Sequence, residues 1–297
     1  MLTSDIDDLL GAFPGRAGIV VKDLSTGACF EYGADDRFPA ASVIKVPIMV
    51  ELYRQVEAGR ISLGQQCGLH DGVCRHGTGH IKENPDRVYT LEQLCRYMIA
   101  DSDDVATDLI TETIGLEQVN QTLADLGFGN TSVPMSMGRW HYTMRGMGDA
   151  TINPENDDIL EQRVREGRID FNTLSYADSL DNNVTSAGDM ARMLEQIHAG
   201  ELVSAAAAAA MLQMLHACDH RGMIPRDLPE DIPIAHKIGQ STRIRADVGI
   251  IYLPGGPIVI CVLTCAPEPG TSRPGKNLIA GIAQRVVNTI KNGSPIA

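Results

Sequence analysis

The chain has 297 residues, of which 43% are hydrophobic and 21% charged, so it is long enough for one large domain or two small ones. Its net charge of −13 argues against non-specific binding to nucleic acid or to an anionic membrane, because both need a basic protein surface. Seven cysteines without a CxxC pair favour buried thiols over a disulfide framework.

The first predicted elements are a short helix, a hairpin and a second helix. Residues 3–13 are amphipathic and acidic. They lack the basic start of a secretory signal, so we expect a cytoplasmic protein, or an extracytoplasmic one if a signal peptide has been removed. Residues 17–23 and 28–32 are apolar, partly alternating runs on either side of a Ser-Thr-Gly turn, which predicts a hairpin. Residues 43–56 are predicted to form a helix, in which Pro47 is tolerable only near the first turn.

The middle of the chain is predicted to be helical, and its end returns to strands. Between Leu91 and Leu215 the apolar spacing is typical of helices, and no strand is convincing; the expected helices cover residues 91–99, 105–114, 116–126, 190–198 and 205–214. Three apolar runs then predict strands, followed by an amphipathic closing helix, at residues 234–238, 247–253, 258–264 and 278–290. The longest apolar stretch, 248–266, is interrupted by a Pro-Gly-Gly-Pro turn and is not a membrane span.

We therefore expect one unit, residues 1–297, in two parts. An α/β subdomain of residues 1–60 plus 228–297 holds a sheet built from both termini, and an all-α subdomain of residues 61–227 is inserted between them. A cleft between the two parts is the natural place for a binding site.

Three short motifs follow one another in an informative order. Ser42 and Lys45 are three residues apart, so on a helix their side chains share a face, and a lysine there can activate a hydroxyl. Ser102–Asp104 precedes a predicted helix, and Lys237–Gly239 lies in a predicted strand near the end of the chain. Each motif is common by chance, but the three in this order are a much more specific signal.

With these motifs the chain resembles the class A β-lactamases and the penicillin-binding proteins, and it is most similar to the broad β-lactamase-like serine hydrolase family. The resemblance covers most of the chain, with matching flanks at residues 38–42, 98–103, 185–191, 236–239 and 247–250. It implies an α/β plus all-α fold, a sandwich in which both termini form an antiparallel sheet around an inserted helical subdomain. It also implies an enzyme with no cofactor and no metal, which acts on a small-molecule amide, lactam or ester and has no nucleic-acid or membrane partner.

The resemblance implies a role for each catalytic residue. Ser42 is the acyl-accepting nucleophile, and Lys45 is its base or proton relay. Ser102 passes a proton toward the leaving nitrogen, and Lys237 supports Ser102 electrostatically. The backbone N–H groups of Ser42 and Gln240 form the oxyanion hole.

The substrate-binding residues depart from the family pattern. Gly239 still lets a substrate approach the strand edge. The usual asparagine is Asp104, which accepts hydrogen bonds when ionised and should favour a substrate with an N–H or ammonium group. The usual hydroxyl residue is Ile238, so Arg243 and Arg245 are the candidates to bind a substrate carboxylate.

Surplus residues lie between Pro134 and Asn182, where the family carries its deacylating glutamate. Residues 134–138 contain no glutamate, so Glu155 is the candidate base. The same region holds a run of polarizable and aromatic side chains, which predicts either core packing or a flexible lid: Met135, Met137, Trp140, His141, Tyr142, Met144 and Met147.

Three alternatives compete with this interpretation. The first is a penicillin-binding-type acyltransferase or peptidase, and the second is a non-catalytic ligand-binding homologue. The third is a zinc site in a segment crowded with possible ligands, whose spacing fits no standard finger and instead favours structural or substrate-facing roles: Cys67, His70, Cys74, His76 and His80.

Overall fold

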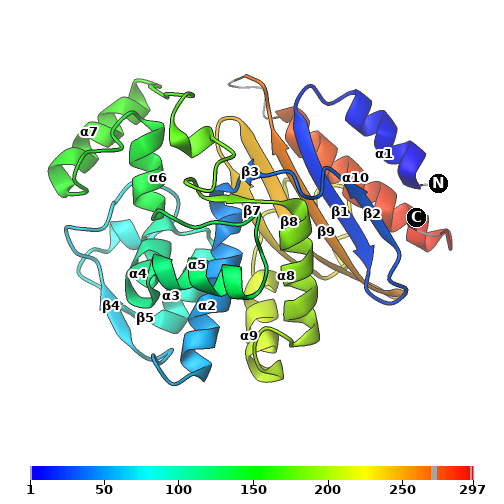
Figure 1. Cartoon of the computed structure of the whole chain (residues 1–297), viewed down its shortest axis with the longest axis horizontal. Coiled ribbons are helices and arrows are strands. Elements are labelled where there is room, and N and C mark those ends of the chain that lie inside the picture. Colours follow the sequence, from blue (N-terminus) through cyan, green and yellow to red (C-terminus); the bar gives the residue numbers. More distant parts are fainter. Residues whose placement is uncertain (1, 269–272, 295, 297) are drawn as a thin grey trace.

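A five-stranded antiparallel sheet built from both ends of the chain forms the centre of the structure (Figure 1). This computed structural model describes residues 2–268, 273–294 and 296. The strand order is β2-β1-β9-β8-β7, and the strands are Arg16–Asp23 (β1), Cys29–Tyr32 (β2), Ile234–Gln240 (β7), Ile244–Leu253 (β8) and Gly256–Cys265 (β9). The predicted fold class is confirmed, because the sheet joins both ends of the chain and a long helical region lies between its N-terminal and C-terminal strands in the sequence.

Each face of the sheet is covered by a pair of helices. Side chains alternate between the faces along a strand, so Ile19 and Val21 pack in one core and Val20 in the other. The helices α1 and α10 cover the first face, and α8 and α9 cover the second (Figure 1). Their bounds are Leu2–Gly11 (α1), Ala187–Ala199 (α8), Ala205–His216 (α9) and Arg273–Lys291 (α10).

The other helices form a group beside the sheet, seen on the left of Figure 1. They are Lys45–Glu57 (α2), Leu91–Ala100 (α3), Asp104–Ile114 (α4), Leu116–Asp125 (α5), Met137–Met144 (α6) and Pro154–Arg165 (α7). Three 3-10 turns join them: Ala41–Ile44 (η1), Ile81–Glu83 (η2) and Leu174–Tyr176 (η3). Two small ribbons pair Phe38–Pro39 (β3) with Val184–Thr185 (β6), and Gln66–Gly68 (β4) with Val88–Thr90 (β5).

The inserted region is not all-helical as expected, because strands β4, β5 and β6 lie within residues 61–227. Strand β6 lies where no strand was convincing, because a two-residue strand is too short to show an alternating pattern. The surplus between Pro134 and Asn182 contains α6, α7 and η3. The subdomain boundaries at residues 60 and 228 stay a prediction. In the structure α2, which lies within residues 1–60, packs among the helices, whereas α8 and α9, which lie within residues 61–227, pack on the sheet.

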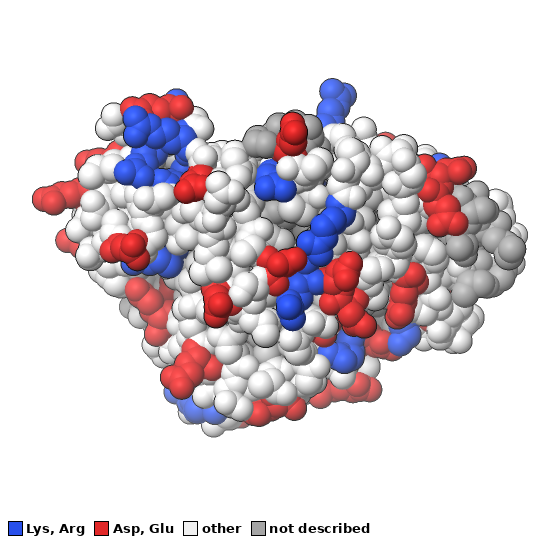
Figure 2. Space-filling model, turned by 45° about the horizontal axis from the view of Figure 1, so that its top comes forward, with Lys and Arg blue, Asp and Glu red and all other residues white. Residues whose placement is uncertain are grey.

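The surface carries the acidic surplus in dispersed form. On the face shown in Figure 2, acidic side chains are spread over the molecule, and basic side chains stand in small groups between them. Within the described residues, every helix is too short or too polar to cross a bilayer.

Candidate active site

The sheet and the helices meet at Ser42. Ser42 is half-buried in η1, and the turn continues directly into α2, whose first residue is Lys45. The preceding Ala41 has φ 44°, a left-handed conformation that costs a non-glycine residue on the order of 1 kcal/mol. Strand β7 lies against this turn, because a Cβ on Gly239 would stand only 2.7 Å from Ala40 O and 3.2 Å from Ser42 N. A side chain at Gly239 would therefore push the strand away from the serine.

Ser102 lies between two buried lysines. It stands in the link between α3 and α4, with φ 56°. Its Oγ is 3.2 Å from Lys45 Nζ and 3.0 Å from Lys237 Nζ, and Lys45 Nζ also donates to Ser102 O at 2.8 Å. Both lysines are 0% exposed. The structure thus brings together residues from the three motifs that the sequence analysis singled out.

Asp104 supplies the negative charge of this group. Burial lowers the pKa of Lys237 to about 7, and the charge of Lys45 adds to the effect. Burial alone would raise the pKa of Asp104, but Lys45 and His141 outweigh it and hold that pKa well below its usual range. At neutral pH the site therefore holds one ion pair, Lys45–Asp104, and one lysine, Lys237, whose charge changes near neutrality.

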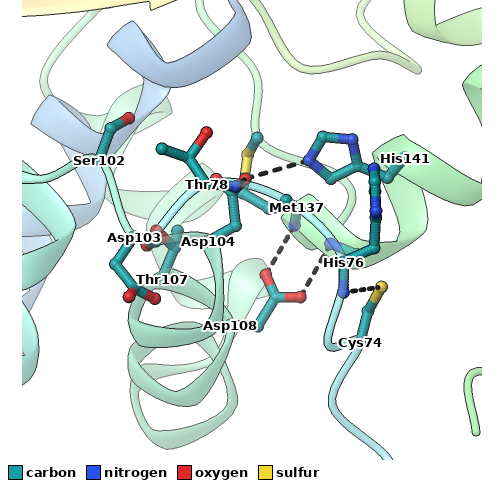
Figure 3. A network of polar contacts seen from close by, with 12 residues as sticks. Cys74, His76, Thr78, Ser102, Asp103, Asp104, Thr107, Asp108, Met137 and His141 are labelled. Atoms are coloured by element: carbon teal, nitrogen blue, oxygen red, sulfur yellow. Dashed lines mark hydrogen bonds and ion pairs between the residues drawn. The ribbon is translucent and has the colours of Figure 1, made fainter. Parts of the chain in front are cut away.

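The carboxylate of Asp104 is engaged on all sides by the protein. Its Oδ1 lies 2.6 Å from Lys45 Nζ, and its Oδ2 lies 3.0 Å from His141 Nε2 and accepts from Thr78 N at 2.9 Å. Figure 3 shows His141 pointing from α6 toward Asp104. Asp104 was expected to contact the substrate, but the structure gives its carboxylate to these three partners and leaves its side chain 4% exposed.

Helix α6 is fixed to α4 by a second aspartate one turn further on. Asp108 Oδ1 accepts from Met137 N at 2.6 Å, and Oδ2 accepts from Gly138 N at 2.8 Å (Figure 3). Burial raises the pKa of Asp108 to about 7, although the two N–H donors oppose the shift. Asp104 and Asp108 share a face of α4 at i, i+4, so one helix face holds both the start of α6 and its His141.

A cavity of about 310 Å³ opens beside these residues. It brings together three predicted site residues, Ser42, Ser102 and Gln240, and Ile238 also lines it. In the described part of the chain the Ser42 hydroxyl has no hydrogen-bond partner, so it is free to meet a molecule in the cavity.

The contacts of Glu155, Arg243 and Arg245 lie elsewhere, and none of the three lines this cavity. Glu155 is exposed in the first turn of α7, after the N-cap Asn153 and a proline, and there it favours the helix start. Arg243 donates to Ala266 O at 2.8 Å and lines a different cavity. The guanidinium of Arg245 donates to the carbonyls of Ser241 and Ile244.

The segment suspected of binding zinc has other contacts. His70 pairs with Glu112 at 2.9 Å, and His76 pairs with Glu161 at 2.7 Å, so the two imidazoles face different carboxylates. Among the residues that the structure describes, no group of three His, Cys, Asp or Glu side chains could hold one metal ion.

Sequence reasoning identified the run around α6 but not the residue in it that reaches the site. Six of the seven side chains of this run are buried apolar or aromatic groups, as core packing requires. The signal was available, because His141 is the one member of this run whose side chain can carry a positive charge.

A family model described as "Beta-lactamase enzyme family" matches residues 1–290. The chain belongs to this family. VEB-1, a β-lactamase of Pseudomonas aeruginosa, is 22% identical over 300 residues, which cover 98% of this chain and 91% of that protein. These matches agree with the resemblance carried by the three motifs.

Solved structures of this family share the fold. A β-lactamase from Sphaerobacter thermophilus matches with a TM-score of 0.76 and 25% identity, over 96% of this chain and 95% of that one. The structure of PBP-A matches with a TM-score of 0.79 and 24% identity, over 98% and 96%.

Proposed function

We propose that this protein is a serine hydrolase that cleaves an amide, lactam or ester bond of a small molecule through an acyl-enzyme on Ser42. One observation carries the proposal: Ser102 Oγ lies within hydrogen-bond distance of two buried ammonium groups, beside a cavity that Ser42 also lines. A non-catalytic homologue would gain nothing from two buried lysines, because burying a charged group lowers the stability of the protein.

Acylation needs a proton path from the nucleophile to the leaving group. In one concerted transfer, Ser102 gives its proton to the leaving nitrogen, the Lys45 ammonium reprotonates Ser102, and the amine thus formed takes the proton of Ser42 as Oγ attacks the carbonyl. The Lys45–Asp104 pair has the same charges before and after the transfer, and the Lys237 ammonium stabilises the Ser102 oxygen during it. The N–H groups of Ser42 and Gln240 are proposed to stabilise the oxyanion.

The insertion contributes His141 to this mechanism instead of Glu155. His141 is a positioning residue in the proposal: it fixes Asp104, and Asp104 fixes Lys45. Because Ile238 replaces a hydroxyl and the two arginines lie elsewhere, a strongly anionic substrate finds few partners in this cavity. We therefore place β-lactams within the substrate class without making them its preferred members.

Intact mass spectrometry tests the proposal with a panel of β-lactams, esters and aminoacyl amides. We expect at least one compound to add its acyl group to the protein, with the added mass on the peptide that contains Ser42. The Ser42→Ala variant should lose the adduct and keep the thermal unfolding of the parent, whereas Ser62→Ala, at an exposed serine outside the cavity, should keep the adduct. An adduct that survives Ser42→Ala would overturn the mechanism.

A penicillin-binding-type acyltransferase is the second candidate. The observation in its favour is that the structure leaves the expected base, Glu155, outside the cavity, which leaves water without an assigned activator. A long-lived acyl-enzyme, released by amines faster than by water, would favour this function over hydrolysis.

A cytoplasmic location also stays within the proposal. All seven cysteines lie in the described residues, and each is a free thiol, which is the usual state in a reducing compartment.

A further inference from the structure

A cysteine, a histidine and an aspartate form a buried cluster at the edge of the candidate active site. Cys218 follows α9, His236 precedes Lys237 in β7, and Asp247 lies on the neighbouring strand β8. None of these three side chains has a part in the acylation mechanism proposed above.

Asp247 orients and charges the histidine. His236 Nδ1 lies 2.8 Å from Asp247 Oδ1, while Asp247 Oδ2 accepts from Ile224 N at 2.9 Å. The two side chains are 1% and 0% exposed. Burial alone would lower the pKa of His236, but Asp247 outweighs it and raises that pKa to about 10, so the imidazole is charged at neutral pH. The imidazole and Cys218 line the same cavity.

Cys218 lies where two cavities meet. One is the cavity of about 310 Å³ that contains Ser42 and Ser102. The other, of about 320 Å³, is lined by Cys218 and His236. Cys218 is only 8% exposed and lines both cavities, so a small molecule seated in either one lies beside this residue.

The environment of Cys218 differs from that of the other cysteines. Burial raises its pKa, but the charges of His236 and Lys237 outweigh burial and lower it, with help from the N–H of His220. By contrast, burial raises the pKa of five other thiols, Cys29, Cys74, Cys95, Cys261 and Cys265. The thiolate is the reactive form of cysteine, and cationic neighbours favour it.

We propose that Cys218, activated by the His236–Asp247 pair, is a modification site that forms mixed disulfides with small disulfide compounds. The Cys218 thiolate attacks one sulfur of the incoming disulfide, so that a new S–S bond forms and the original one breaks. The second half leaves as a thiolate and takes up a proton from solvent. The incoming disulfide is the oxidant, and a free thiol in excess reverses the reaction.

The modification has a consequence for catalysis, and this part of the inference rests on the proposed function. A group attached to Cys218 extends into the cavity that Ser42 lines and excludes substrate from it. The thiol would then act as a reversible redox switch on acylation of Ser42.

The experiment treats the native protein with 2-hydroxyethyl disulfide and follows each of the seven cysteines by peptide mass spectrometry. We expect Cys218 to be modified at least about tenfold faster than Cys29, a half-buried thiol that serves as the reference within the same molecule. Dithiothreitol should remove the adduct. Equal rates at Cys218 and Cys29 would overturn the proposal.

Variants test the cause of the reactivity. His236→Gln should lower the ratio of the Cys218 rate to the Cys29 rate about tenfold or more. Asp247→Asn is a second route to the same loss if His236→Gln unfolds, and unfolding is recognised because it exposes all seven thiols alike. An unchanged ratio in a folded variant would overturn the role of the pair.

Acylation of Ser42 provides the last readout. In the parent, disulfide treatment should block acylation, whereas in Cys218→Ser the same treatment should have no effect relative to untreated Cys218→Ser. Acylation that continues on fully modified parent protein would overturn the switch. A protein that is never acylated at Ser42, even untreated, would refute the proposed function and leave the thiol site to be judged by the rates at Cys218 alone.

Discussion

The side chain of Ser102 has an unusual electrostatic position, because two ammonium groups approach one hydroxyl oxygen inside the protein. Only Lys45 has a carboxylate partner, Asp104, and the pKa of Lys237 falls to about 7 through burial and repulsion. The charge of Lys237 therefore changes as the pH passes through neutrality.

Lys237→Arg tests this control. If the charged form of Lys237 supports proton transfer through Ser102, acylation of the parent should decline as pH rises through about 7. Arginine stays charged, so the variant should lose this decline even if its overall rate falls. Single-turnover acylation measured against pH decides the matter, and a decline that persists unchanged in Lys237→Arg would assign it to another group.

Asp104→Asn tests the buried ion pair. The pKa of Asp104 is lower in the folded chain than in the unfolded one, so its stabilising contribution is present above the usual carboxyl pKa of about 4 and is lost as pH falls below it. Removing one partner of a buried pair costs about 3 kcal/mol, because the lysine charge remains. We expect Asp104→Asn to lower the free energy of unfolding by about this amount at neutral pH and by much less in acid.

Urea unfolding at several pH values measures the difference, with Asp101→Asn, at an exposed neighbouring carboxylate, as the control. Equal stability of Asp104→Asn and the parent at neutral pH would show that the pair is not stabilising. Either result bears on the role in holding Lys45 that the contact between the two side chains suggests for Asp104, whereas its effect on substrate polarity stays a prediction.

Helix α6 is short and depends on α4 for its position. Asp108 accepts from its first two N–H groups, and His141 in its second turn meets Asp104. An eight-residue helix has little stability of its own, so these contacts decide where it lies.

Asp108→Ala should release this helix. The substitution leaves two buried N–H groups unpaired, at a cost of about 1–3 kcal/mol each. We expect faster amide hydrogen exchange in residues 137–144 and slower acylation of Ser42, because His141 no longer holds Asp104. Asp125→Ala, at an exposed end of α5, is the control. Normal exchange in α6 of the Asp108 variant would contradict the anchoring role.

The sequence predicted the long elements well, since a helix such as Leu116–Asp125 or a strand such as Gly256–Cys265 repeats its pattern several times. It did not predict β3 and β6, whose two residues each carry no period. The Asn-Pro-Glu run around Glu155 suggested a catalytic base, yet it is a helix start in which Asn153 caps and a proline occupies the first turn.

For the site, the sequence predicted the residues that meet around Ser102, because the order of the three motifs along the chain is much more specific than any one motif. The full set of partners of Asp104 was not predictable, since Lys45, Thr78 and His141 lie far apart in the sequence. Likewise, His236 and Asp247 were noticed only as flanks of motifs, because pairing across β7 and β8 is a property of strand register.

The N-terminal strand is central to the assembled protein, although it comes from the start of the chain. Strand β1 lies between β2 and β9 and pairs with both, so it connects β2 to the three C-terminal strands of the sheet. Helix α1, in contrast, packs beside α10, and its Ile6 is fully buried in the core shared with the sheet.

Two N-terminal deletions separate these contributions. Removing residues 2–11 should lower the thermal midpoint but leave one cooperative transition, because losing a buried isoleucine costs about 2–5 kcal/mol. Removing residues 2–23 should abolish cooperative unfolding, since β9 then has no partner on that side. Thermal unfolding followed by near-ultraviolet circular dichroism compares the two, and a cooperative transition in the longer deletion would show that the sheet forms without β1.

Because Gly239 lies in close contact with the backbone at Ser42, acylation of Ser42 can report when the sheet forms during folding. The two segments come from opposite ends of the chain, and they meet only after β7 has docked beside η1. A chain with native helices but an open sheet would therefore lack the oxyanion hole that we propose. During refolding, acylation of Ser42 should lag behind the return of helical circular dichroism, so a covalent substrate would time the moment at which the sheet closes.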